Sequence, residues 1–181
     1  MLGALSVTPY FYYECQNWLR KKSLLKDLLK KQTKNQNTLN GFYTDLNSNS
    51  NYIDEFISIF FDEIQQFGKD IQSQSVKINT LWSVEYNQYD YHEVHTHGDS
   101  DFSAILYVDY KKNVHPSTCF VIDKVDPISK KTIINRGEFV DEGGIMFFPS
   151  NVLHYSNPNQ SFTKKTIVSF NLDIYGNIND L

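Results

Sequence analysis

The sequence has few of the features that mark a secreted or membrane-spanning protein. Its 181 residues include only two cysteines, Cys15 and Cys119, too few for a disulfide framework and typical of reduced thiols in a cytosol-like compartment. No run of 18 or more apolar residues occurs, and the N-terminus lacks a basic region followed by a long apolar core. We therefore expect a cytoplasmic protein without a membrane span or a signal peptide.

An excess of positive charge is also missing. The formal net charge is −4, which gives no reason to expect nucleic acid as a bulk electrostatic partner. Hydrophobic residues make up 40% of the chain and aromatic residues 15%, so a folded globule is expected rather than a disordered chain. The length suits one domain with a substantial core.

The first part of the chain carries helical patterns. Residues 4–13 are aromatic and β-prone, as in an edge strand or a lead-in. An amphipathic helix is predicted from Gln16 to about Gln32 and a second from Tyr52 to Phe67, with a polar loop over residues 33–51 between them. Seven Lys and Arg residues between positions 20 and 34 are interpreted as a solvated helix face rather than an anion-binding patch.

The rest of the chain is rich in short β-type runs separated by turn residues. We predict an α+β protein, mainly β, whose strands close into a jelly roll or another antiparallel double sheet. The predicted strands are KINTLWSVEY, DFSAILYVDY, STCFVID, KTIIN, EFVDE (residues 138–142), GGIMFFP and KTIVSFNLDI.

Histidines are concentrated just before one of these strands. Of five in the chain, His92, His95 and His97 lie within six residues of one another, directly before the strand-like run Phe102–Tyr110. Alternate side chains of an extended segment point the same way, so His95 and His97 could face one point, with His154 arriving from a distant strand. Three such ligands with open positions suit a catalytic divalent metal.

The spacing of the histidines and acidic residues limits which kind of metal site is possible. The segment HEVH does not have the HExxH spacing, so a zinc-protease helix is excluded. His115, beside Pro116 in a turn, is predicted to be structural or incidental. His97-Gly98-Asp99 is itself a literal H-x-D, so Asp99 is an alternative metal ligand.

The last predicted strand has one polar face. Alternation places Lys165, Ile167, Ser169 and Asn171 on one side and a more uniformly apolar set on the other. A face with Lys, Ser and Asn inside a β body predicts a polar cavity with a cation to hold an acid, although a solvent-facing strand side would show the same pattern.

Together these motifs resemble the 2-oxoglutarate/Fe(II)-dependent dioxygenase superfamily, in its small prolyl-hydroxylase-like branch. The branch shows H-x-H and then S-G-V-Y-Y-V, similar to residues 95–97 and 103–108. A Gly followed by L-x-F-P-S-x-x-x-H is similar to residues 144–154, and R-I-S-I-S-F-N is similar to residues 165–171, with Lys in place of Arg. The resemblance covers about residues 80–174.

The resemblance implies a double-stranded β-helix flanked by N-terminal helices. It implies one dioxygenase-like domain over residues 1–181, with helical support at about 14–68 and a β-helix core at about 77–175. The implied enzyme is an oxidoreductase that uses Fe(II), 2-oxoglutarate and O₂, releases succinate, and hydroxylates a prolyl or other side chain or a small molecule. A homodimer stays open. Small proteins of this branch are also similar to bacteriophage proteins, for which the location would be the host cytoplasm.

The family roles carry over to particular positions. His95, His97 and His154 would be the metal ligands, and Lys165 would pair with the distal carboxylate of 2-oxoglutarate. The other candidates for cosubstrate binding are Tyr107, Ser169 and Asn171. Two alternatives stay open: a metal-binding cupin that does not use 2-oxoglutarate, and a metal-free jelly roll that acts as a binding module.

Overall fold

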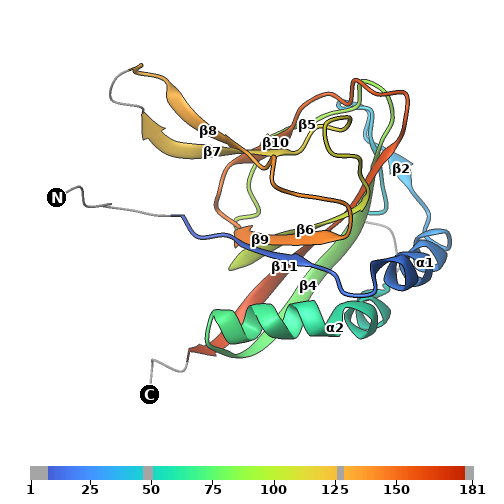
Figure 1. Cartoon of the computed structure of the whole chain (residues 1–181), viewed down its shortest axis with the longest axis vertical. Helices are drawn as coiled ribbons and strands as arrows, with labels where there is room; N and C mark the ends of the chain where they lie inside the picture. The colour runs from blue at the N-terminus through green and yellow to red at the C-terminus, as the bar shows by residue number, and fades with distance from the viewer. Residues whose placement is uncertain (1–7, 47–50, 126–128, 178–181) are drawn as a thin grey trace.

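The structure is a computed structural model, and it describes residues 8–46, 51–125 and 129–177. It confirms a mainly β protein with two antiparallel sheets and two helices (Figure 1). In chain order the elements are β1 (Phe11–Glu14), α1 (Trp18–Leu29), β2 (Asn35–Gln36), β3 (Tyr43–Thr44), α2 (Ile53–Asp70), β4 (Ser73–Tyr86), β5 (His92–His95), β6 (Phe102–Asp109), β7 (Thr118–Val125), β8 (Thr132–Arg136), β9 (Gly144–Pro149), β10 (His154–Ser156) and β11 (Lys165–Asn177).

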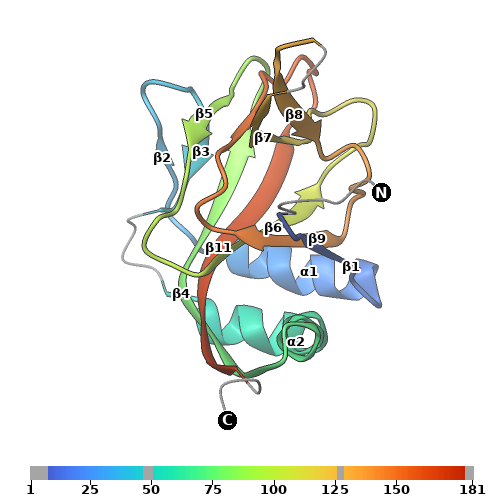
Figure 2. The same cartoon turned by 90° about the vertical axis from the view of Figure 1, so that its left-hand side faces the viewer.

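The two sheets face each other as the walls of a jelly roll. The larger sheet has the strand order β1-β9-β6-β11-β4-β3-β2, and the smaller one has the order β5-β10-β7-β8. Both helices cover the outer face of the larger sheet, away from the smaller one (Figures 1 and 2). The inner space between the sheets is therefore free to hold a site.

Alternation along the strands divides the apolar residues between two cores. On β11, Val168, Phe170 and Leu172 belong to the core under the helices, whereas Ile167 belongs to the core between the sheets. The predicted alternation of this strand is confirmed, and its polar face points into the protein instead of into solvent. The core under the helices also takes the apolar face of α2, from which Phe56, Phe60 and Phe67 are fully buried.

Several predicted boundaries need correction. The 33–51 loop contains the two-residue strands β2 and β3, which are too short to show a period. The predicted strand at residues 138–142 forms turns instead. Of the predicted strand at residues 4–13, residues 4–7 lie outside the described part of the chain, and β1 at its end is an edge strand paired with β9.

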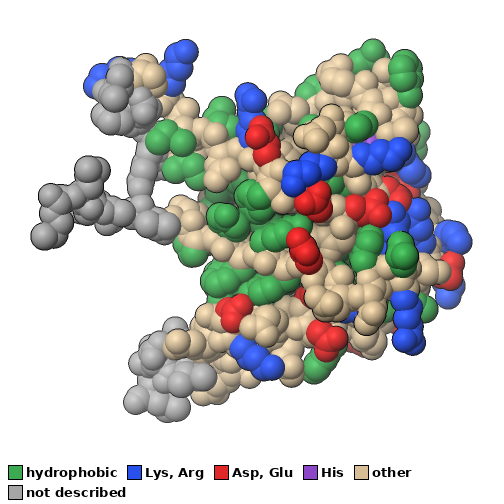
Figure 3. Space-filling view, viewed as in Figure 1, with side chains coloured by type: hydrophobic (Ala, Val, Ile, Leu, Met, Phe, Trp, Pro, Cys, Tyr) green, Lys and Arg blue, Asp and Glu red, His purple; other side chains and the backbone are tan. Residues whose placement is uncertain are grey.

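Most of the cations on and just after α1 form ion pairs with acidic side chains and are not gathered into an anion-binding patch. Lys22 lies 3.0 Å from Asp109 and 2.7 Å from Glu142, and Lys26 lies 2.8 Å from Asp109. Figure 3 shows Lys and Arg side chains intermixed with acidic ones over this end of the molecule. Neither helix of the described residues is long and apolar enough to cross a bilayer.

A buried carboxylate joins three segments that support the larger sheet. Asp45, 4% exposed, accepts hydrogen bonds from the Ser83 backbone N–H at 2.6 Å, from the Ser83 hydroxyl at 3.0 Å and from the Tyr52 hydroxyl at 3.0 Å. We expect Asp45→Ala to lower the free energy of unfolding by about 2–4 kcal/mol, because it leaves three buried donors without an acceptor. Urea unfolding measures this loss. Asp27→Ala, which breaks only an exposed pair with Lys30, is the matched control and should change the same quantity by less than about 0.5 kcal/mol.

Candidate metal and cosubstrate site

Three histidines converge between the sheets, at the place where β5 meets β10. His95 ends β5 and His154 begins β10, and the antiparallel register pairs the two residues directly. His97 follows in the next loop, where its backbone N–H donates to the Ser150 carbonyl at 2.9 Å. This position corrects the expectation that both His95 and His97 lie on one strand face. One ligand atom from each of the three histidines lies within 4.8 Å of the others.

Backbone carbonyls orient two of these rings. Nδ1 of His95 lies 2.8 Å from the Glu93 carbonyl oxygen, and Nδ1 of His154 lies 2.8 Å from that of Val152. Because a carbonyl only accepts, Nδ1–H must be the donor in both bonds, which leaves Nε2 of each ring with a free lone pair. This is the tautomer a metal ligand needs.

Burial keeps the cluster uncharged. It lowers the pKa of His154 to about 3 and that of His97 to about 4, and the neighbouring His95 adds to both effects. Asp99, the alternative ligand, is exposed and is not among the residues whose ligand atoms converge. Within the described residues the converging donors are therefore three neutral imidazoles, a set that suits a divalent transition metal.

A buried cation lies at the other end of the same pocket. Lys165 is 1% exposed, and its Nζ donates to the Pro116 carbonyl at 2.7 Å and to the Ser156 hydroxyl at 3.0 Å. Nζ also lies 4.9 Å from the centre of the Tyr86 ring. Burial lowers the pKa of Lys165 to about 7. No acidic side chain of the described residues pairs with this ammonium group, so the site favours an anionic ligand.

The wall between the metal cluster and Lys165 contains residues that were not among the predicted site residues. The His92 ring stacks on the His95 ring with centroids 4.2 Å apart, and its Nδ1 lies 3.2 Å from the Tyr86 hydroxyl. Ser156 and Thr118 line the same space. Two of them could have been found by alternation, since Ser156 is two residues from His154 and Tyr86 is four from Trp82, which also faces inward.

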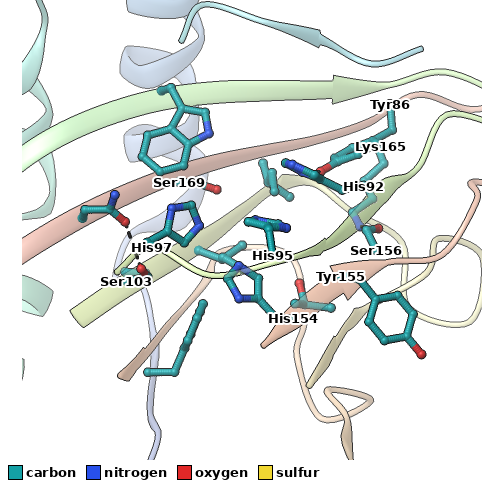
Figure 4. Close-up of a pocket in the computed structure, with 17 residues that line it drawn as sticks. Tyr86, His92, His95, His97, Ser103, His154, Tyr155, Ser156, Lys165 and Ser169 are labelled. Carbon is teal, nitrogen blue, oxygen red and sulfur yellow. Dashed lines mark hydrogen bonds between the residues drawn. The ribbon is translucent and has the colours of Figure 1, made fainter. Parts of the chain in front are cut away.

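The remaining predicted residues lie at different depths. Tyr107 is fully buried behind Thr118, to whose hydroxyl it donates a hydrogen bond of 3.0 Å, and it does not itself line the pocket. Ser169 and Asn171 do line it, but on the far side of the cluster from Lys165. Figure 4 shows Ser169 and Ser103 beside His97, with Lys165, Ser156 and Tyr86 beyond His95 on the opposite side. His115, predicted to be structural, bonds Thr163 at 2.8 Å outside this pocket.

Comparisons with known proteins agree with this geometry. The profile of the family described as "Putative 2OG-Fe(II) oxygenase" matches residues 80–171, about half of the chain, and the chain belongs to this family. The enzyme is thus an oxidoreductase whose cofactors are Fe(II) and 2-oxoglutarate. This membership decides against the cupin and metal-free alternatives. No protein with a curated description matches the sequence closely enough to add to this.

Solved structures of the same fold include several oxygenases. A 2OG-Fe(II) oxygenase family oxidoreductase from Burkholderia pseudomallei aligns with a TM-score of 0.66 at 8% identity, over 91% of this chain and 84% of that one. A Pseudomonas putida prolyl-4-hydroxylase aligns with a TM-score of 0.60 at 10% identity, over 92% of each chain. The viral collagen prolyl hydroxylase of Paramecium bursaria Chlorella virus-1, in its 2OG complex, aligns at 0.56 and 14%, over 92% of this chain and 96% of that one. At these identities the likeness establishes the fold alone.

Proposed function

We propose that His95, His97 and His154 hold a single Fe(II), that Lys165 binds the distal carboxylate of 2-oxoglutarate, and that the enzyme hydroxylates a prolyl or other side chain or a small molecule. The observation that carries this proposal is the pairing, in one pocket, of three converging imidazoles with a buried ammonium group that lacks an acidic partner. When bound, Fe(II) supplies the redox chemistry that couples oxidation of 2-oxoglutarate by O₂ to hydroxylation of a C–H bond.

The chain's own residues have three tasks in this scheme. The carbonyls of Glu93 and Val152 fix two imidazoles in the ligand tautomer before metal arrives. Lys165 and Ser156 offer an ammonium group and a hydroxyl to one end of the diacid, which orients its other end toward the histidines. The apolar walls exclude bulk water from between them, which strengthens each of these electrostatic contacts.

The predicted role of Tyr107 is indirect in this arrangement. Its hydroxyl holds Thr118, which lines the pocket, so it would position the cosubstrate through that residue. A cytoplasmic location, the absence of nucleic-acid and membrane partners, a homodimer and the single domain with its boundaries stay predictions from the sequence.

Turnover without a hydroxylation substrate tests the proposed function. Protein loaded with Fe(II) and supplied with 2-oxoglutarate and ascorbate should form succinate and consume O₂ in equal amounts, at a slow uncoupled rate. Absence of both 2-oxoglutarate binding and succinate formation in folded, iron-loaded protein would contradict the assignment.

The pKa of Lys165 predicts how cosubstrate binding depends on pH. The ammonium form attracts the carboxylate, so affinity for 2-oxoglutarate should be constant below pH 7 and fall, by up to about tenfold per pH unit, as pH rises above the pKa of about 7. Other titratable groups that face Lys165 are Tyr86 on β4, His92 on β5, Cys119 on β7 and His115 in the preceding loop.

Calorimetric titration of Zn(II)-loaded protein with 2-oxoglutarate between pH 6 and 9 measures this dependence. Lys165→Arg keeps the positive charge throughout the range, so it should show a flat profile. An equally steep fall in this variant would assign the pH dependence to another group.

A further inference from the structure

A second set of polar groups lies on the side of the metal cluster that faces away from Lys165. It consists of Trp82, Ser103, Ser169 and Asn171, which we call the mouth niche. The sheet register brings them together, since β11 pairs Ser169 with Trp82 of β4 and pairs Asn171 with Ser103 of β6. All four line the same pocket as the three histidines, and the Trp82 ring centre lies 5.4 Å from that of His97.

The mouth niche and Lys165 lie on opposite sides of the histidine cluster in one pocket. Six residues of strand separate Asn171 from Lys165, which is roughly 20 Å between Cα atoms at about 3.3 Å per residue. Figure 4 shows Ser103, the hydrogen-bond partner of Asn171, beside His97 and away from Lys165. A diacid held by Lys165 therefore approaches the histidines from the side opposite the niche.

Three polar groups of the mouth niche have no hydrogen-bond partner among the described residues. The Ser103 hydroxyl donates to Oδ1 of Asn171 at 2.9 Å, which fixes the carboxamide and leaves its Nδ2 as a free donor. Nε1 of Trp82 and the hydroxyl of Ser169 are also unpaired, although these side chains are 5% and 8% exposed. Because these donor atoms are accessible from the pocket and are not sealed inside the protein, they are available to water or to a ligand that accepts hydrogen bonds.

The ligand of these donors should be uncharged. Among the described residues that line the pocket, Lys165 is the only Lys, Arg, Asp or Glu, and it lies at the opposite end. The carboxylate of Asp101, two residues from Ser103, accepts a hydrogen bond from the Ile174 backbone N–H at 2.9 Å. When 2-oxoglutarate is bound, its two negative charges offset those of the divalent ion. An anionic or cationic substrate group would then lose its hydration without gaining a counter-charge, whereas a carbonyl oxygen would gain a donor.

We infer that the mouth niche binds an amide carbonyl of the substrate, with Asn171 Nδ2 as its donor and the Trp82 ring as a flat wall of the same pocket. This inference rests on the proposed function, because it takes the histidines as the metal centre and Lys165 as the cosubstrate anchor. The substrate class is then an uncharged peptide or another amide, held so that a C–H bond next to the amide lies at the metal. Asn171 and Ser169 change from predicted cosubstrate contacts to substrate contacts.

Trp82 fluorescence provides the test, because the chain has only two tryptophans and Trp18→Phe leaves Trp82 alone. The Zn(II)- and 2-oxoglutarate-loaded variant is titrated with N-acetylproline N-methylamide and with N-acetylproline, its charged counterpart. We expect saturable binding of the amide and at least about tenfold weaker binding of the acid. Failure of the amide to bind, or equal binding of the acid, would overturn the inference.

Two further variants separate the two ends of the pocket. Asn171→Leu should weaken amide binding about three- to tenfold, as expected for one hydrogen bond, and leave 2-oxoglutarate affinity within about twofold. Lys165→Met should weaken 2-oxoglutarate binding and leave amide affinity unchanged. For this variant, amide binding is measured on Zn(II)-loaded protein without 2-oxoglutarate. Loss of 2-oxoglutarate affinity in Asn171→Leu would return Asn171 to the cosubstrate site. Should Asn171→Leu not fold, Ser103→Ala, which frees the Asn171 carboxamide to rotate, should also weaken amide binding.

The unsubstituted protein separates this inference from the proposed function. If it does not bind 2-oxoglutarate at all, the proposed function fails. If it binds 2-oxoglutarate but no amide, only this inference fails.

Discussion

The His154→Ala variant is expected to bind no Fe(II) at stoichiometric concentrations and to form no succinate. His154 is the only one of the three converging imidazoles that comes from the distant β10, so its removal leaves two ligands from one short segment, and a ligand pair holds a divalent ion far more weakly than a facial triad. We expect at least about a hundredfold loss of metal affinity, comparable to the larger losses seen when metal-site partners are removed. Anaerobic Fe(II) titration and succinate analysis measure both effects.

The matched control for this prediction is His115→Gln. This histidine bonds Thr163 and the backbone N–H of Lys111, outside the pocket, so the variant should bind one Fe(II) per chain. Succinate formation that survives in folded His154→Ala would exclude His154 as a ligand.

Lys165→Met should lower the affinity for 2-oxoglutarate by about thirty- to a hundredfold while leaving metal binding intact. The distal carboxylate would lose a charge-assisted hydrogen bond in a site from which water is excluded. The same substitution should leave the unliganded protein as stable or more so, because a buried ammonium group with no acidic partner among the described residues is replaced by an apolar chain of similar length. Calorimetry with 2-oxoglutarate and urea unfolding give the two numbers.

A fall in 2-oxoglutarate affinity without a fall in the free energy of unfolding distinguishes a binding role of Lys165 from a structural one. A residue that only supports the fold would lose stability together with affinity. Unchanged 2-oxoglutarate affinity in Lys165→Met would contradict the proposed anchor and leave the diacid without a cation in this pocket.

Elements long enough to show a periodic apolar pattern could be predicted from the sequence, whereas very short elements could not. Helix α2 carries apolar residues at steps of three and four over most of its length, so its face was predictable. Strands β5 and β10 have four and three residues, too few to show alternation, although they hold His95 and His154. The segment at residues 138–142 has a β-type sequence but forms turns. Its Val140 is fully buried although it does not belong to a strand.

The candidate site was predictable where chemistry is concentrated in one residue type. Histidines are scarce in this chain, so three near one another and a fourth after a rigid turn indicated a metal centre. The choice between His97 and Asp99 depends on how the loop after β5 is held by Ser150, which sequence spacing does not record. Asn171 and Lys165 share one strand face, but they lie on opposite sides of the three histidines. This placement depends on the registers of β10 on β5 and of β11 on β4, which the sequence does not record.

The identity of the ligands is the central claim, and X-ray absorption of the anaerobically Fe(II)-loaded protein tests it most directly. The structure predicts one iron per chain with the multiple-scattering signal of three imidazoles, unchanged in Asp99→Asn. His97→Ala, which leaves only a pair of ligands, should not retain stoichiometric iron. A spectrum with two imidazoles and a carboxylate in the unsubstituted protein, or one that changes in Asp99→Asn, would contradict the three-histidine site.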